Sequence, residues 1–171
     1  FMPDPEIFRE TIEFKADRIS QRLRELAFLN SGLEIVFRDE RQTDAKPEVF
    51  YYKDGTEEFV KQLNKSKTPL HPKPIAFRKE TKEKNDDKDI EVHVEVVLQY
   101  NDSYNDQVLC YTNTVHNPDG GSHLSGFRSA VTRAINQYAK SNELLKEKDP
   151  QITGDDVREG LTAVISVKHS D

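Results

Sequence analysis

The sequence has little that would support covalent cross-linking or membrane insertion. Its single cysteine, Cys110, excludes an internal disulfide. No secretory leader is recognisable, so we expect a protein of the reducing cytoplasm. No stretch of about 18 apolar residues is present, so we expect no membrane-spanning helix. Residues 1–3, Phe-Met-Pro, are not typical of a natural start, and we expect a piece of a longer protein.

Motifs of a self-contained active site are also missing. The sequence contains no glycine-rich phosphate loop of the Walker type and no dinucleotide fingerprint. Its five histidines lack the spacing of a zinc protease helix, and one cysteine is too few for a structural zinc site. We therefore expect no catalytic, cofactor-binding or metal-ligating residue within this chain.

An excess of positive charge is absent too. Charged residues make up 33% of the chain and apolar residues 35%, and the formal net charge is −6. This composition predicts one ordinary domain with a modest core beneath a heavily charged surface. An acidic chain binds nucleic acid poorly unless its cations gather locally, because non-specific affinity comes mainly from cations that meet phosphates.

Hydrophobic periodicity predicts an α+β fold, a mostly antiparallel sheet covered on one face by helices. Apolar residues at helical spacing predict helices over residues 17–30, 56–64 and 123–140, and a short helical turn over residues 155–158. Asp17 is the expected cap of the first helix. Alternating apolar residues predict strands over residues 33–38, 48–53, 75–77, 91–100, 107–114 and 161–168.

The order of these strands predicts that strands consecutive in the chain pair with each other. A polar loop joins strands 33–38 and 48–53 as a hairpin. Strand 107–114 follows a turn and is the expected antiparallel partner of strand 91–100. Residues 78–89 carry ten charges in twelve positions, which favours a solvated hairpin tip.

Several polar residues are candidates for chemistry, and each also has a structural interpretation. Cys110 lies in a strand pattern, which favours a small core residue over a nucleophile. His93 lies on the polar face of its strand and is expected to be exposed. Asp155, Asp156 and Glu159 could bind a divalent ion or transfer protons. Acids at the start of a helical turn also serve as caps, and we favour that interpretation.

Glycines and cations around the long helix form the other candidates. Gly120 and Gly121 join a strand to this helix, where a helix start can attract an anion; we favour a tight structural turn. Arg128, Arg133 and Lys168 could face DNA or simply be solvated. On the helical wheel Arg133 lies about 140° from Arg128, so these two cannot form one compact phosphate clamp.

Two blocks of the sequence carry a recognisable signature. Residues 119–128 read DGGSHLSGFR and match a GG[TS]H…GF pattern at Gly120, Gly121, His123, Gly126 and Phe127. Residues 154–168 read GDDVREGLTAVISVK, with motif positions Asp155, Asp156, Arg158, Glu159 and Gly160. These blocks resemble the ATPase subunits of bacterial type II DNA topoisomerases, gyrase B and its topoisomerase IV counterpart, and residues 23–30 and 67–71 also match in order and spacing.

The resemblance implies a fold and a role. Residues 1–16 would be the tail of a preceding ATPase domain or a linker, and residues 17–171 an incomplete transducer domain. The fold would be a ribosomal-protein-like sheet with a left-handed βαβ crossover, against the usual handedness. The transducer would relay nucleotide state to DNA-strand passage and negative supercoiling, without catalysis of its own.

The resemblance also implies what the full-length protein binds. It would be an ATP-hydrolysing DNA topoisomerase that uses ATP and Mg²⁺ outside this chain. Its partners would be DNA and the gyrase A protein, and homodimerisation through the ATPase domain would build an A2B2 assembly. Three alternatives stay open: the transducer of the topoisomerase IV counterpart, active in decatenation, a DNA-contacting module, and a structural spacer domain.

Overall fold

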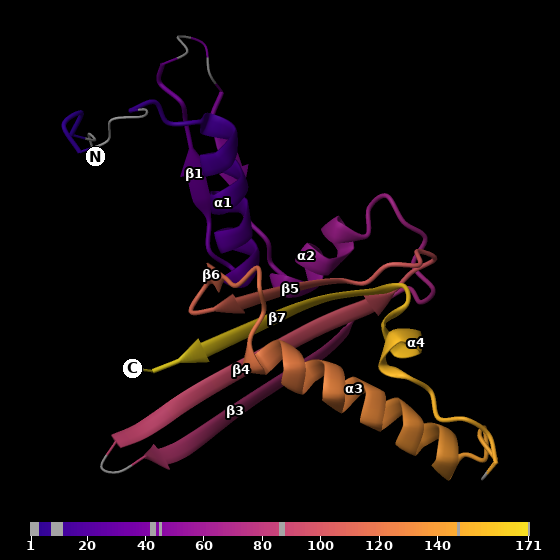
Figure 1. Cartoon of the computed structure of the whole chain (residues 1–171). Coiled ribbons are helices and arrows are strands. Elements are labelled where there is room, and N and C mark those ends of the chain that lie inside the picture. Colours follow the sequence, from indigo (N-terminus) through magenta and orange to yellow (C-terminus); the bar gives the residue numbers. More distant parts are fainter. Residues whose placement is uncertain are drawn as a thin grey trace. The chain divides into compact units, whose positions relative to one another are not determined.

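The computed structural model divides the chain into two compact units, residues 1–55 and 56–171 (Figure 1). It describes residues 4–7, 12–41, 44, 46–85, 88–146 and 148–170. The division falls at Gly55, whereas the change of role expected near residue 17 stays a prediction. Within the described residues, no helix is long and apolar enough to cross a membrane.

The first unit is a helix packed on a two-stranded hairpin. Its elements are α1 (Ala16–Leu29) and the antiparallel strands β1 (Ile35–Phe37) and β2 (Glu48–Phe50). Phe28 is buried, and its ring stacks on Tyr52 with centroids 3.7 Å apart. The helix and the hairpin are therefore confirmed. The cap expected at Asp17 is wrong: Lys15 is the N-cap, and Asp17 lies in the first turn, where an acid complements the helix dipole.

The second unit is a five-stranded sheet with helices on it. Its elements are α2 (Thr56–Leu63), β3 (Ile75–Asn85), β4 (Lys88–Tyr100), β5 (Gln107–Thr112), β6 (Val115–His116), α3 (Ser122–Ser141), α4 (Gly154–Arg158) and β7 (Leu161–His169). The strand order is β3-β4-β7-β5-β6, and β5 and β7 form the one parallel pair among these described strands. The expected α+β class is confirmed.

The last strand, β7, lies between β4 and β5. Strand β5 is therefore not the partner of β4, and the expected β4–β5 pairing is wrong. The connection through α3 returns the chain to the centre of the sheet, where residues 161–166 are buried along their whole length. A strand that is buried on both faces belongs in the middle of a sheet. The left-handed sense of this crossover stays a prediction.

Helices cover both faces of the sheet, and not one face as expected. At the end of α2, Asn64 Nδ2 donates to Gln99 Oε1 at 2.9 Å. On α3, Phe127 packs against a buried cluster that contains Leu98 and Leu161. Leu98 and Gln99 are consecutive in β4, so their side chains point to opposite faces of the sheet. Helix α3, which contacts Leu98, and helix α2, which ends beside Gln99, therefore lie on opposite faces. Figure 1 shows the two helices on the two sides of the sheet.

The charged run of residues 78–89 forms the arms of a long hairpin. Backbone pairing of β3 with β4 extends from Ile75 to Asn85. The expected hairpin is confirmed, and residues 78–80 and 82 are exposed, but the tip does not extend over the whole run. Opposite charges face each other across the strands: Lys82 Nζ lies 2.5 Å from Glu91 Oε1. Such cross-strand pairs allow a polar sequence to stay extended. The tip itself, residues 86–87, lies outside the described residues.

Candidate functional site

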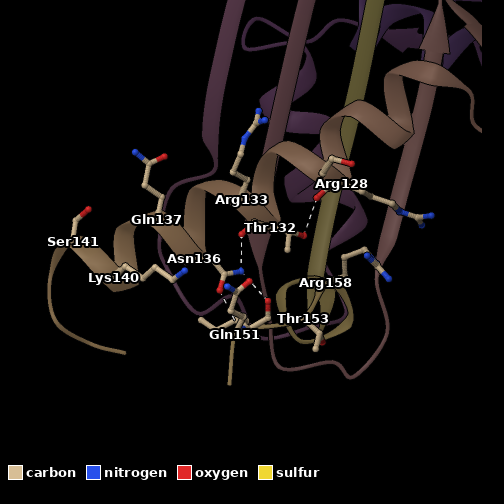
Figure 2. A pocket seen from close by; sticks show the side chains of 13 residues that line it. Arg128, Thr132, Arg133, Asn136, Gln137, Lys140, Ser141, Gln151, Thr153 and Arg158 are labelled. Carbon is tan, nitrogen blue, oxygen red and sulfur yellow. Dashed lines mark hydrogen bonds between the residues drawn. The ribbon is translucent and has the colours of Figure 1, made fainter. Parts of the chain in front are cut away.

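A hollow of about 840 Å³ lies beside α3 and the start of α4 (Figure 2). Four cations line it: Arg128, Arg133, Lys140 and Arg158. The other described lining residues are small or neutral, mainly serine, threonine, asparagine and glutamine, and none of them is acidic. Cations together with neutral donors are the groups that proteins use to hold phosphate oxygens.

The floor of this hollow is built by side chains that bind backbone. Asn136 on α3 donates from Nδ2 to the carbonyl oxygen of Ile152 at 2.8 Å and accepts from its N–H at 3.0 Å. This pair of hydrogen bonds ties the segment before α4 to the middle of α3. The backbone N–H of Asp156 then donates to Thr153 Oγ1 at 3.3 Å, and Thr153 N–H donates to Asp156 Oδ2 at 2.8 Å.

These last two bonds form a capping box at the start of α4. The hydrogen bonds from Thr153 lower the pKa of Asp156, so this carboxyl stays ionised as a cap. Asp155 pairs with Arg158 one turn later, and Glu159 is exposed at the helix end. The structural interpretation of Asp156 is thus confirmed. Among the residues described, no three acidic, histidine or cysteine side chains gather to hold a metal ion.

Arg128 and Arg158 share one carboxylate. Arg128 Nη2 lies 3.2 Å from Asp106 Oδ2, and Arg158 Nε lies 3.8 Å from the same oxygen. No sequence pattern selects Asp106, because it sits in a polar turn before β5 and only the fold brings that turn to α3. In Figure 2, Arg128 and Arg158 extend to the same side of α3, and Arg133 points away from them. Arg128 and Arg133 therefore line one hollow but do not form one clamp.

Lys168 is separate from this hollow. It is exposed near the end of β7, and its cross-strand neighbour is His93. Both residues line a second, smaller hollow of about 300 Å³ together with Glu80 and Glu95. His93 Nδ1 lies 3.1 Å from Glu80 Oε1, and its side chain keeps 45% of its exposure. Acids therefore line the hollow beside Lys168, whereas the acids near the α3 hollow, Asp106 and Asp155, pair with its arginines but do not line it.

Two of the motif glycines, Gly120 and Gly160, occupy positions where a side chain would be strained. Gly120 has φ +75°, and a Cβ there would lie 2.4 Å from Leu124 Cδ2, in agreement with a tight turn before α3. Gly160 has φ +70°, and a Cβ there would lie 2.3 Å from the carbonyl oxygen of Asn101. Gly126 meets no such contact and lies on α3 beside Phe127.

His123, Gly126 and Phe127 line an apolar groove of about 430 Å³ between α3 and the strands. Phe127 is partly buried and also packs on the core cluster, which links α3 to the sheet. Cys110 on β5 is 1% exposed, and burial raises the pKa of its thiol. The expectation that Cys110 is a core residue is confirmed.

Comparisons with known proteins agree on one family. A family model described as DNA gyrase B matches residues 55–171. The DNA gyrase B protein of Clostridium acetobutylicum is 48% identical over 168 residues, which cover 98% of this chain and 25% of that protein. The DNA gyrase B protein of Enterococcus faecalis is 43% identical over 171 residues, which cover 100% of this chain and 25% of that protein.

A solved structure gives the same result. The crystal structure of the 43K ATPase domain of Thermus thermophilus gyrase B, in complex with an aminocoumarin, matches with a TM-score of 0.79 and 44% identity. The match covers 99% of this chain and 43% of that structure. The chain thus spans about a quarter of the length of the two curated relatives, from Clostridium acetobutylicum and Enterococcus faecalis.

Proposed function

Because the chain belongs to the DNA gyrase B family, we propose that its second unit is the transducer of an ATP-dependent type II DNA topoisomerase. The unit begins at Thr56 and the family match begins at residue 55, so two independent boundaries coincide. In this proposal residues 1–55 are the end of a preceding domain, and the boundary first expected near residue 17 moves to Gly55.

The cationic hollow on α3 is the observation that carries the proposed DNA contact. Arg128, Arg133 and Lys140 project from one helix of an otherwise acidic chain. Such local clustering is what an acidic protein needs in order to meet a phosphate backbone. The contacts would be to phosphates and would not read base sequence.

Packing supplies a route from the hollow to the sheet. Phe127 is the neighbour of Arg128 on α3 and packs against Leu98, Leu161 and Ala163. Leu161 and Ala163 lie on the central strand β7. Side chains in contact transmit displacement from one element to the next. In this proposal a load on Arg128 moves α3 against β7.

ATP and Mg²⁺ are proposed cofactors of the longer protein only. We expect this chain to contribute no residue to their binding, because its sequence has no phosphate loop of the Walker type. DNA, the gyrase A protein and a second copy joined through the ATPase domain are the proposed partners in the cytoplasm. Negative supercoiling is preferred over decatenation because two relatives that are 43% and 48% identical over at least 98% of the chain are gyrase B proteins.

Replacing Arg128 with glutamine in the full-length protein tests the DNA contact. DNA-stimulated ATP hydrolysis, measured with the gyrase A protein present, should fall several-fold because a charged phosphate contact is lost. Lys61→Gln is the control, since it removes a cation from α2 on the opposite face of the sheet. Equal stimulation in wild type and Arg128→Gln would remove Arg128 from the DNA-facing residues.

A further inference from the structure

We propose that Asp106 is an internal competitor for the phosphate position beside Arg128 and Arg158, and that it keeps DNA binding at this hollow weak. The inference rests on the proposed function, in which the hollow meets the DNA backbone. It concerns a residue that belongs to neither resembling block of the sequence and does not itself line the hollow.

The geometry is that of a bound anion. One oxygen, Asp106 Oδ2, lies 3.2 Å from Arg128 Nη2 and 3.8 Å from Arg158 Nε. A phosphate oxygen that bridges two guanidinium groups would need the same position, because guanidinium N–H groups recognise carboxylate and phosphate in the same way. Asp106 and a DNA phosphate therefore cannot both hold this pair of arginines at once.

The local charge depends on this one residue. Arg128 and Arg158 carry two positive charges, and their acidic partners are Asp106 and Asp155. The formal charges of these four groups sum to zero, and the sum becomes +1 when the charge of Asp106 is removed. For Arg133 and Lys140, none of the ion pairs among the described residues includes either side chain. These two cations attract a phosphate backbone, while the Arg128–Arg158 pair is balanced by carboxylates until DNA displaces Asp106.

The side chains are open enough for such an exchange. The side chain of Arg128 is 41% exposed to solvent, that of Asp106 is 31% exposed and that of Arg158 is 25% exposed. Arg128 Nε is buried, so its Nη2 end is the part that exchanges partners. A duplex that is transported must also be released, and a competing carboxylate weakens binding without removing any cation.

Removing the charge of Asp106 without changing its size tests the proposal. In the full-length protein with the gyrase A protein, Asp106→Asn should lower the DNA concentration for half-maximal stimulation of ATP hydrolysis by about two- to fivefold, the range of a partly exposed ion pair. The gain should shrink at high salt because the added attraction is screened. Asp119→Asn is the matched control: it changes net charge equally, and Asp119 is exposed and does not line the hollow.

The results separate this inference from the proposed function. Arg128→Gln, measured beside the other variants, should raise the half-maximal DNA concentration. If it does so and Asp106→Asn leaves the value unchanged or raises it, Asp106 positions Arg128 and does not compete, and the inference is overturned. If Arg128→Gln has no effect, the DNA contact itself fails. Asp106→Asn should unfold thermally at the same temperature as wild type. This control shows that a change in DNA stimulation does not come from loss of the fold.

Discussion

Replacing Gly160 with alanine tests the contact that fixes the start of β7. The carbonyl oxygen of Gly160 accepts from the N–H of Asn101 at 2.9 Å, so two backbone segments touch directly. An added Cβ would lie 2.3 Å from the carbonyl oxygen of Asn101 and 3.0 Å from that of Ser103. Neither acceptor is a flexible side chain, so the backbone itself has to move.

The expected cost follows from these contacts. A side chain at φ +70° costs about 1–2 kcal/mol, and overpacking against a neighbour adds about 1–3 kcal/mol. Gly160→Ala should therefore lower the free energy of unfolding by about 2–5 kcal/mol. The assay is urea denaturation of the 171-residue chain, followed by far-ultraviolet circular dichroism.

A second glycine gives the matched control. An added Cβ at Gly126 meets no heavy atom within 4 Å, and the residue lies inside helix α3. Gly126→Ala should raise the free energy of unfolding by about 0.5–1 kcal/mol, because alanine favours helix. Equal free energies of unfolding for Gly160→Ala and Gly126→Ala would refute the predicted clash at Gly160.

Three further predictions concern α4 and β5. Thr153→Ala should cost about 1 kcal/mol of stability through the lost cap, measured by thermal unfolding. The stabilisation from Asp156 should be present above the ordinary pKa of an aspartate and be lost as the pH falls through its lowered folded-state pKa; a difference between wild type and Asp156→Asn that persists in strong acid would contradict this. Cys110, buried with a raised thiol pKa, should react with a thiol reagent only as fast as the chain unfolds, and rapid labelling of the native protein would contradict it.

Local patterns predicted most of the elements. Apolar residues at helical spacing placed α1, α2 and α3 within about two residues of their observed ends. The capping box at Thr153 and Asp156 was accessible for the same reason, since all of its groups lie within four consecutive residues. Signals of this kind depend only on near neighbours in the chain.

Local sequence patterns did not predict the pairing of segments that are distant in the chain. The six residues at the start of β7 include the polar residues Thr162 and Ser166, and all six are buried. Thr162 is instead buried in a hydrogen-bond network, with its Oγ1 accepting from Asn101 Nδ2 at 3.0 Å. A partner 61 residues away in the chain satisfies the hydroxyl, so the central position of β7 left no periodic signal.

The hollow was only partly predictable. The helical wheel separates Arg128 from Arg133, and the structure agrees. A wheel describes one helix only, so it does not predict contacts with other segments. Arg158 and Asp106 reach Arg128 from α4 and from the turn before β5. Their approach depends on the order of strands in the sheet, which no single segment encodes.

Coupling of ATP turnover to DNA movement is the role proposed for the second unit. It is tested most directly by the number of supercoils introduced per ATP hydrolysed by the full-length enzyme carrying Phe127→Ala, which loosens α3 from its core cluster. Val60→Ala, a buried change on α2, serves as the control for lost stability. We predict a lower ratio for Phe127→Ala and a wild-type ratio for Val60→Ala. A wild-type ratio in both, despite reduced stability, would show a structural spacer and contradict the proposed coupling.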